Sequence, residues 1–390
     1  MTTALPQRDF GFGDDETELR DLARRFLADR LPATRLRELV ATDHEAVYAR
    51  GESAGWDADL WTEIVDMGWT ATTVPEDAGG TPVSTAGLVG LAEEAGFRAL
   101  PSPLASTIAA TRLLVACDRD AARPWLAAIA EGATATLATT DPSGSWQPEH
   151  CGVEASDHDG GHRLSGRAAF VQDAGKAGLF VVLCAAGAGH VLAVVPKDAP
   201  GLTIEPDHIH DLTHDQATLR FDSVAIGGDA VVSTDALEAI RAAWPAILAI
   251  TSADLCGTAE WLLQTTVDYA KDRVQFDRPI GFFQAVKHPI VNVMIDLDRA
   301  RSLLYHAAAE IDADSPDAEI AARMAKSAAS DAAGFAADRA VQLHGGIGFT
   351  WEHDAHIWFK RAMHNQALYG DGRYQRRILA DLMLGPASTT

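Results

Sequence analysis

The sequence predicts an α+β protein that is mostly α-helical, with a β domain between two helical domains. Apolar residues recur at spacings of three and four before residue 130 and again after residue 234, which is typical of amphipathic helices. Between these parts, short β-branched and apolar runs are separated by Gly, Asp and Pro clusters, as in strands joined by turns. We therefore expect helices in 1–130, a β-barrel-like domain in 131–233 and a four-helix bundle in 234–390.

Composition limits the class of protein. The chain has 390 residues, 47% of them hydrophobic, which is enough for sizeable cores. Its formal net charge of −23 disfavours nucleic acid as a partner, because phosphate backbones are bound by clustered Lys and Arg. No run of about 18 apolar residues and no signal peptide is evident, so we expect no membrane span and a cytoplasmic location. Four scattered cysteines lack metal-site spacing and are expected to be reduced.

The N-terminal helices are predicted from their start signals. From Asp14, acidic residues fill a first helical turn and Leu19, Leu22 and Phe26 follow on one face. Ser84 follows a turn rich in Pro and Gly and is expected to cap another helix. In the middle domain, strands are expected within 133–139, 168–171, 179–184, 190–195, 202–204 and 217–221.

The C-terminal part is expected to hold long helices with short connections. The predicted segments are 236–241 with Asp235 as N-cap, 245–273, 289–312, 316–343, 354–367 and 372–384. Pro289 suits the first turn of a new helix, since its missing N–H would have no partner there. Such elements pack as an antiparallel bundle.

One loop of this bundle, within 269–288, is unusually rich in hydrogen-bond donors. Arg273, Gln275, Arg278 and Gln284 surround the aromatic Phe276 in a chain that is otherwise acidic. Guanidinium and amide donors on a rigid loop suit a phosphate-bearing ligand. The alternative is that these residues cap two helices and pair with neighbouring acids.

A second stretch contains a glycine turn after a long helix. Gln342 precedes Gly345, Gly346 and Gly348, and glycines allow a ligand to approach backbone N–H groups closely. A glycine triplet alone is a weak signal.

Taken together, these two stretches resemble the acyl-CoA dehydrogenase family. The order R-x-Q-F-x-x-P-I-x-x-F-Q from Arg273 is similar to the family's loop for the pyrophosphate and adenosine of FAD. The glycine stretch resembles the family's segment that reaches a neighbouring subunit's FAD. The resemblance implies an oligomer in which the FAD contacts are made by Arg273, Gln275, Phe276, Gln284, Gln342, Gly345 and Gly346.

The resemblance extends to the β domain, with departures. The segment 139–146 stands where the family usually has Thr-Glu-Pro-Gly-x-Gly-Ser. This match implies that Thr140 contacts the flavin, but Asp141 stands in place of the family's Glu. Phe170 and Gln172 stand where a Trp and a Thr usually face the flavin ring. Phe170 is expected to stack on a ring and Gln172 to donate to one. The alternative is an ordinary strand with one core aromatic.

The family's reaction is the α,β-desaturation of an acyl-CoA thioester, in which FAD takes a hydride and a carboxylate removes the α-proton. The base must be held close and partly desolvated. Most members carry it as Glu in a Tyr-Glu-Gly-Thr segment, but here 368–373 reads Leu-Tyr-Gly-Asp-Gly-Arg. The alternative position falls near Ile247, which is no acid.

Three interpretations follow from the missing Glu. Asp371 is the base; or the chain is the base-less subunit of a heteromeric dehydrogenase and works with a Glu-bearing paralogue; or the fold serves other flavin chemistry or acts as an interaction module. The residues of both motifs resemble those of actinobacterial subunits that act on sterol side-chain CoA esters.

Overall fold

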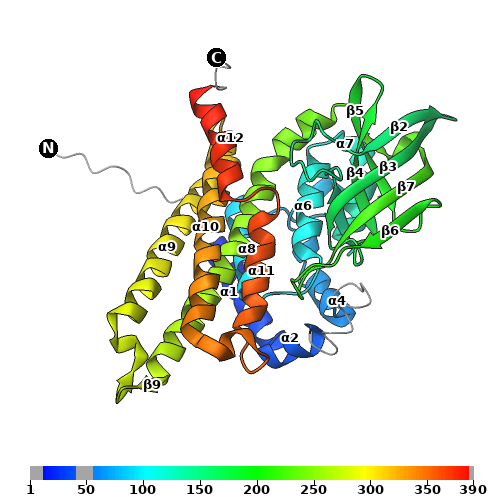
Figure 1. Ribbon diagram of the computed structural model, residues 1–390. Coiled ribbons are helices and arrows are strands. Elements are labelled where there is room, and N and C mark those ends of the chain that lie inside the picture. Colours follow the sequence, from blue (N-terminus) through cyan, green and yellow to red (C-terminus); the bar gives the residue numbers. More distant parts are fainter. Residues whose placement is uncertain (1–11, 41–55, 386–390) are drawn as a thin grey trace.

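A computed structural model describes residues 12–40 and 56–385 of the chain (Figure 1). Its N-terminal helices are α1 (Asp14–Arg30), α2 (Ala33–Val40), α4 (Ala58–Asp66), α5 (Thr85–Phe97), α6 (Leu104–Val115) and α7 (Arg119–Ala130). Helix α1 begins at Asp14 as expected, and the Ser84 hydroxyl accepts a hydrogen bond from the Gly87 amide to cap α5. The predicted mostly helical α+β class is confirmed.

The middle of the chain forms one mixed sheet of eight strands. They are β1 (Ala135–Ala138), β2 (Val153–His158), β3 (Gly161–Gln172), β4 (Leu179–Ala186), β5 (Gly189–Pro196), β6 (Leu202–Pro206), β7 (Gln216–Gly227) and β8 (Val231–Ser233). The order is β6-β7-β3-β2-β4-β5-β8, with β1 pairing to β4 in parallel. Each predicted run overlaps a strand, but β2 and β8 were not predicted, because β2 is polar on its exposed positions and β8 is only three residues long.

The C-terminal helices are α8 (Ala236–Asp272), α9 (Gln284–Asp312), α10 (Ala318–His344), α11 (Ala355–Ala367) and α12 (Gly372–Leu384). Two predicted boundaries are wrong, since Pro245 lies inside α8 and Pro289 inside α9. Each proline removes a single backbone hydrogen bond. In α8 this loss is tolerated because most of the helix is buried, and in α9 because Pro289 lies near the start of the helix. Asp235 is the N-cap residue of α8, but its side chain makes no capping bond.

Helix α8 is the centre of the molecule. By length and composition it is the one helix of the described part that could cross a membrane, yet 83% of its most apolar window is buried inside the protein. It packs against α5 on one side and α10 on the other. A Cβ on Gly257 of α8 would lie 1.9 Å from the Glu93 carbonyl oxygen of α5, so only glycine permits this approach.

Two hydrophobic clusters form the interior of the described residues. One joins the N-terminal and C-terminal helices through residues such as Leu27, Leu91, Leu255 and Leu304, and the other lies within the sheet. Asp312, the last residue of α9, accepts hydrogen bonds from the amides that open α5. The helices at both ends of the chain therefore form one rigid framework against which the sheet packs.

Candidate active site

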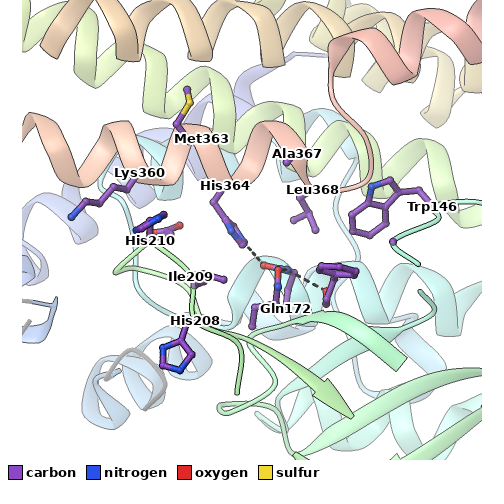
Figure 2. A pocket seen from close by; sticks show the side chains of 14 residues that line it. Trp146, Gln172, His208, Ile209, His210, Lys360, Met363, His364, Ala367 and Leu368 are labelled. Carbon is purple, nitrogen blue, oxygen red and sulfur yellow. Dashed lines mark hydrogen bonds between the residues drawn. The ribbon is translucent and has the colours of Figure 1, made fainter. Parts of the chain in front are cut away.

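A cavity of about 490 Å³ lies between the end of β3 and helix α11 (Figure 2). Trp146 marks one end, where Phe170 is 38% exposed and its ring centroid lies 6.4 Å from that of Trp146. Lys360 and His208 lie at the other end (Figure 2), and Asp211 also lines the cavity. Phe170 has a left-handed backbone (φ 56°), which turns its ring out of the strand. The cavity thus has an aromatic end and a polar end.

A chain of hydrogen bonds crosses the cavity wall. His364 Nε2 lies 2.5 Å from Gln172 Oε1, as Figure 2 shows. The Gln172 amide donates to Gln216 Oε1 (2.8 Å) and to the Phe170 carbonyl (3.3 Å), and the Gln216 amide donates to Asp207 (2.8 Å). Both N–H groups of Gln172 are therefore engaged, so donation to a ligand would require releasing one of them.

Burial keeps His364 neutral. Desolvation lowers its pKa to about 4. Its ring stacks on His214 with centroids 5.8 Å apart. A neutral imidazole that donates from Nε2 to Gln172 is the arrangement that the hydrogen-bond chain requires.

A buried ionic network supports the cavity from behind. Arg361 Nη2 and Nε lie 2.5 and 3.0 Å from the Asp254 carboxylate, and Nη1 donates to Thr213 at 2.7 Å. Burial disfavours the charged guanidinium, yet Asp254 raises the pKa of Arg361. Asn365 also donates to Asp254 at 2.8 Å. These contacts join α8, α11 and the loop before β7, and they hold the wall that carries His364.

The space behind this wall is small. A pocket of about 30 Å³, bounded by Leu368, Tyr369 and Asp254 among others, lies between α6, α8 and α11. That is the volume of about one water molecule. Tyr369 closes it: the residue is buried, has a left-handed backbone (φ 59°), and its ring meets Trp146 and Trp244 with centroids 5.5 and 5.3 Å away.

The segment in which the base is expected presents its carboxylate to solvent. Asp371 is the exposed N-cap of α12 and accepts from the Tyr374 amide at 2.8 Å. It does not line the cavity. Ile247, the alternative position, is buried in α8. The role of Asp371 stays a prediction.

Lys326 of α10 fixes this segment. The side chain is fully buried, and Nζ donates to the carbonyls of Asn365 (3.3 Å), Gln366 (3.0 Å) and Gly370 (3.1 Å) and to the Ser330 hydroxyl (3.0 Å). Desolvation lowers its pKa to about 7. The lysine satisfies carbonyls at the end of α11 that the helix itself leaves unpaired.

The predicted cofactor loop lies elsewhere, at the tip of the bundle far from the sheet (Figure 1). It is a small hairpin of β9 (Val274–Gln275) and β10 (Arg278–Pro279). Phe276 is 82% exposed. Arg273, Gln275 and Gln284 are exposed, and no acceptor among the described residues pairs with the Arg273 guanidinium. The loop offers an unused cation and an uncovered ring.

The predicted glycine turn (Gly345–Phe349) lies at the same end of the bundle. Gly345 has a left-handed φ of 64°, and a Cβ on Gly345 or Gly346 would meet nothing within 4 Å. Gln342 is exposed on the last turn of α10. The Tyr269 ring, one turn before Arg273, stacks on His344 with centroids 4.5 Å apart. The loop and the turn are thus neighbours with open space around them.

Thr140 differs from the other predicted residues. It is buried, its carbonyl accepts from the Ala169 amide at 2.8 Å, and it does not line the cavity. Among the described residues no group of His, Cys, Asp and Glu could hold a metal ion. No local pattern marks Asp254, Arg361 or His364, because their contacts join residues about a hundred or more positions apart.

Comparison with known proteins defines the class. Residues 13–133 match the acyl-CoA dehydrogenase N-terminal domain and residues 249–384 its C-terminal domain. The chain is 31% identical to acyl-CoA dehydrogenase IpdE2 of Mycolicibacterium smegmatis over 88% of this chain and 96% of that protein. It therefore belongs to the acyl-CoA dehydrogenase family of flavin oxidoreductases, as the sequence motifs predicted.

Further relatives refine the comparison. Acyl-CoA dehydrogenase FadE34 of Mycobacterium tuberculosis is 31% identical over 94% of this chain, which spans about half (48%) of that protein's length. The ChsE4-ChsE5 complex from the same species shares the fold with a TM-score of 0.86 at 24% identity, covering 97% of this chain and 100% of that one. The Tcur3481-Tcur3483 steroid ACAD variant has a TM-score of 0.85 at 27% identity, with the same coverages.

Proposed function

We propose that the chain is a subunit of an FAD-dependent acyl-CoA dehydrogenase that relies on a partner chain for the catalytic base. Its loop at Arg273 and its turn at Gly345 would bind the phosphates and adenosine of an FAD shared with that partner. The observation that carries the proposal is the segment 369–371, where Tyr369 fills the interior and Asp371 faces solvent as a helix cap.

The residues at the bundle tip fit an anionic, aromatic cofactor. Among the described residues, Arg273 has no partner, Phe276 is 82% exposed and Gly345 has open space beside it, which leaves charge, ring and amide groups uncovered. The loop lies far from the cavity that contains Phe170 and Gln172, so its ligand would be completed by a second subunit. Bound FAD would supply the hydride acceptor of the reaction.

The cavity wall explains why this chain would not desaturate an acyl group by itself. Removing an α-proton requires a carboxylate within hydrogen-bond reach of the carbon acid. Asp371 is held by the Tyr374 amide outside the cavity. Asp211 lines the cavity but accepts hydrogen bonds from the Thr213 amide and hydroxyl, and Asp254, the acid among the residues that line the inner pocket, is paired with Arg361. The 30 Å³ behind Tyr369 also leaves no room for an acyl chain.

The comparisons support a partner and a substrate class. The ChsE4-ChsE5 structure is a complex of two named chains, and Tcur3481-Tcur3483 is described as a steroid ACAD. We propose a Glu-bearing paralogue as partner and a sterol-derived CoA ester as substrate.

The proposal is tested by purifying the chain alone and with a co-expressed Glu-bearing paralogue. Alone, the chain should hold little flavin, or flavin that acyl-CoA does not bleach under anaerobic conditions. The complex should hold flavin that is bleached, and Asp371→Asn in this chain should leave that rate nearly unchanged. Bleaching by the chain alone, with a loss of about a thousandfold in the Asn variant, would make Asp371 the base instead.

A further inference from the structure

A second large hollow, about 560 Å³, lies between α1, α5, α8 and α9. It shares no lining residue with the cavity beside α11. Four arginines line it, Arg20, Arg24, Arg98 and Arg301. We call it the arginine cleft. In a chain with a net charge of −23, such a concentration of guanidinium groups is unusual.

Two of the arginines neutralise the carboxylates of the arginine cleft. Arg24 binds Glu94 at 2.7 and 3.1 Å. Arg301 binds Glu93 at 2.5 Å and Glu260 at 2.7 Å. Arg24 also lies 3.8 Å from Asp21 on its own helix, so all the carboxylates in this network are paired with Arg24 or Arg301.

The side chains of the other two arginines have no polar partner among the described residues. Neither the Arg20 nor the Arg98 guanidinium forms a hydrogen bond or ion pair with any residue in 12–40 or 56–385, and the Nε of each is buried without an acceptor. Each guanidinium instead stacks on a ring: Arg20 lies 4.7 Å from the Phe12 centroid and Arg98 lies 5.3 Å from that of Phe97. Stacking holds the guanidinium plane and leaves its N–H edge for a ligand.

Burial disfavours the charge on Arg98. Burial lowers the pKa of its guanidinium, although Glu94 partly opposes this. A half-buried cation without a hydrogen-bond partner is destabilising, and native proteins rarely leave such a group unsatisfied.

We infer that the arginine cleft binds an oxyanion of the phosphate class through the unpaired guanidiniums of Arg20 and Arg98, which both line it. Two guanidinium forks present the paired donors that match phosphate oxygens. The cleft is larger than inorganic phosphate, so it also has room for a phosphate ester such as a nucleoside monophosphate. This site is independent of the proposed flavin and acyl-CoA contacts.

The test measures binding to the full chain in a phosphate-free buffer at constant ionic strength. Inorganic phosphate and adenosine monophosphate are titrated by calorimetry against the wild-type chain, Arg98→Gln, Arg20→Gln and Arg25→Gln. Arg25 is exposed on α1 outside the cleft and serves as the matched control. Each cleft variant should bind at least about tenfold more weakly, the loss expected for one charge-assisted contact, and the control should bind like wild type.

Thermal unfolding gives a second readout that does not depend on detecting heat. Phosphate should raise the melting temperature of the wild type and of Arg25→Gln, but not of Arg98→Met. Without phosphate, Arg98→Met should melt no lower than wild type, because it removes an unpaired buried cation. Tighter binding of the nucleotide than of phosphate would identify a phosphate ester as ligand, and equal affinities would identify free phosphate. Equal responses in all variants, or no binding to the wild type, would overturn the inference.

Discussion

Arg273 is the residue on which the proposed cofactor contact at the bundle tip depends most. Its guanidinium has no acceptor within the described chain, so replacement by Ala removes a ligand contact without breaking an internal one. A charge-assisted hydrogen bond contributes about 1.5–3 kcal/mol, and Arg273→Ala should therefore lower flavin affinity about tenfold or more. The measurement is flavin absorbance per chain after dialysis of the assembled protein.

The matched control for this prediction is Lys271→Ala. Lys271 is an exposed cation at the same end of α8, and its contact is with Asp268 on its own helix. It should retain wild-type flavin content. If Arg273→Ala also retains it, the loop does not bind the cofactor.

The sequence predicts the environment of some residues but not of others. The exposure of Phe276 and the left-handed turn at Gly345 follow from local signals, a Pro-Gly loop and a glycine after a helix. The pairing of Asp254 with Arg361 could not be predicted from the sequence, because 107 positions separate the two residues and nothing near either one distinguishes it from a charged surface residue. One N–H group of Gln172 donates to Gln216 in another strand, and this contact could not be predicted from the sequence either.

At the scale of elements, the junction between α11 and α12 is controlled by Lys326. Because burial lowers its pKa from 10.5 to about 7, the unfolded chain binds one more proton than the folded chain between these values. Stability contributed by this site therefore rises with pH across that window and levels off below pH 7. The difference in unfolding free energy between wild type and Lys326→Met should increase from pH 7 to pH 9.

Urea unfolding at several pH values measures this difference. Lys271→Met, which replaces an exposed lysine, should show no such slope. A pH-independent difference for Lys326→Met would mean that Lys326 keeps an ordinary pKa in the folded chain.

Element boundaries show where local signals fail. Pro289 marks a helix start by itself, but α9 begins earlier, at Gln284, in a stretch that has no buried residue before Val293. Pro245 should end a helix, yet α8 continues because residues on both sides of it are buried. Helix type was predictable from periodicity, whereas helix ends depended on packing partners that are distant in the sequence.

At the scale of the whole molecule, exposed apolar residues on α9 and the bundle tip indicate association. Phe282 at the bundle tip is 57% exposed, and the consecutive α9 residues Met294 and Ile295 form an apolar patch at 46% and 56% exposure. A patch of this kind is typical of a protein interface. We expect the chain to sediment as a dimer or larger assembly, alone or with its partner.

Charge placed in this patch should weaken the assembly. Ile295→Glu is expected to shift sedimentation toward the monomer by at least about tenfold in dissociation constant, since it buries an unpaired charge. Asp59→Asn, at an exposed position of α4 in the N-terminal part, is the control. A monomeric wild-type chain that holds stoichiometric flavin would contradict both this prediction and a site shared between subunits.

The shared core of the first and last helices also constrains how the protein is made. Every residue of α5 from Thr85 to Gly96 is buried, largely against α8. Leu91 leaves the ribosome before Leu255 has been added, and at about 5–20 residues per second the interval between them is roughly ten seconds or more. During that time α1 can cover part of α5, but the face of α5 that packs on α8 has no partner, so this face must be shielded until α8 emerges.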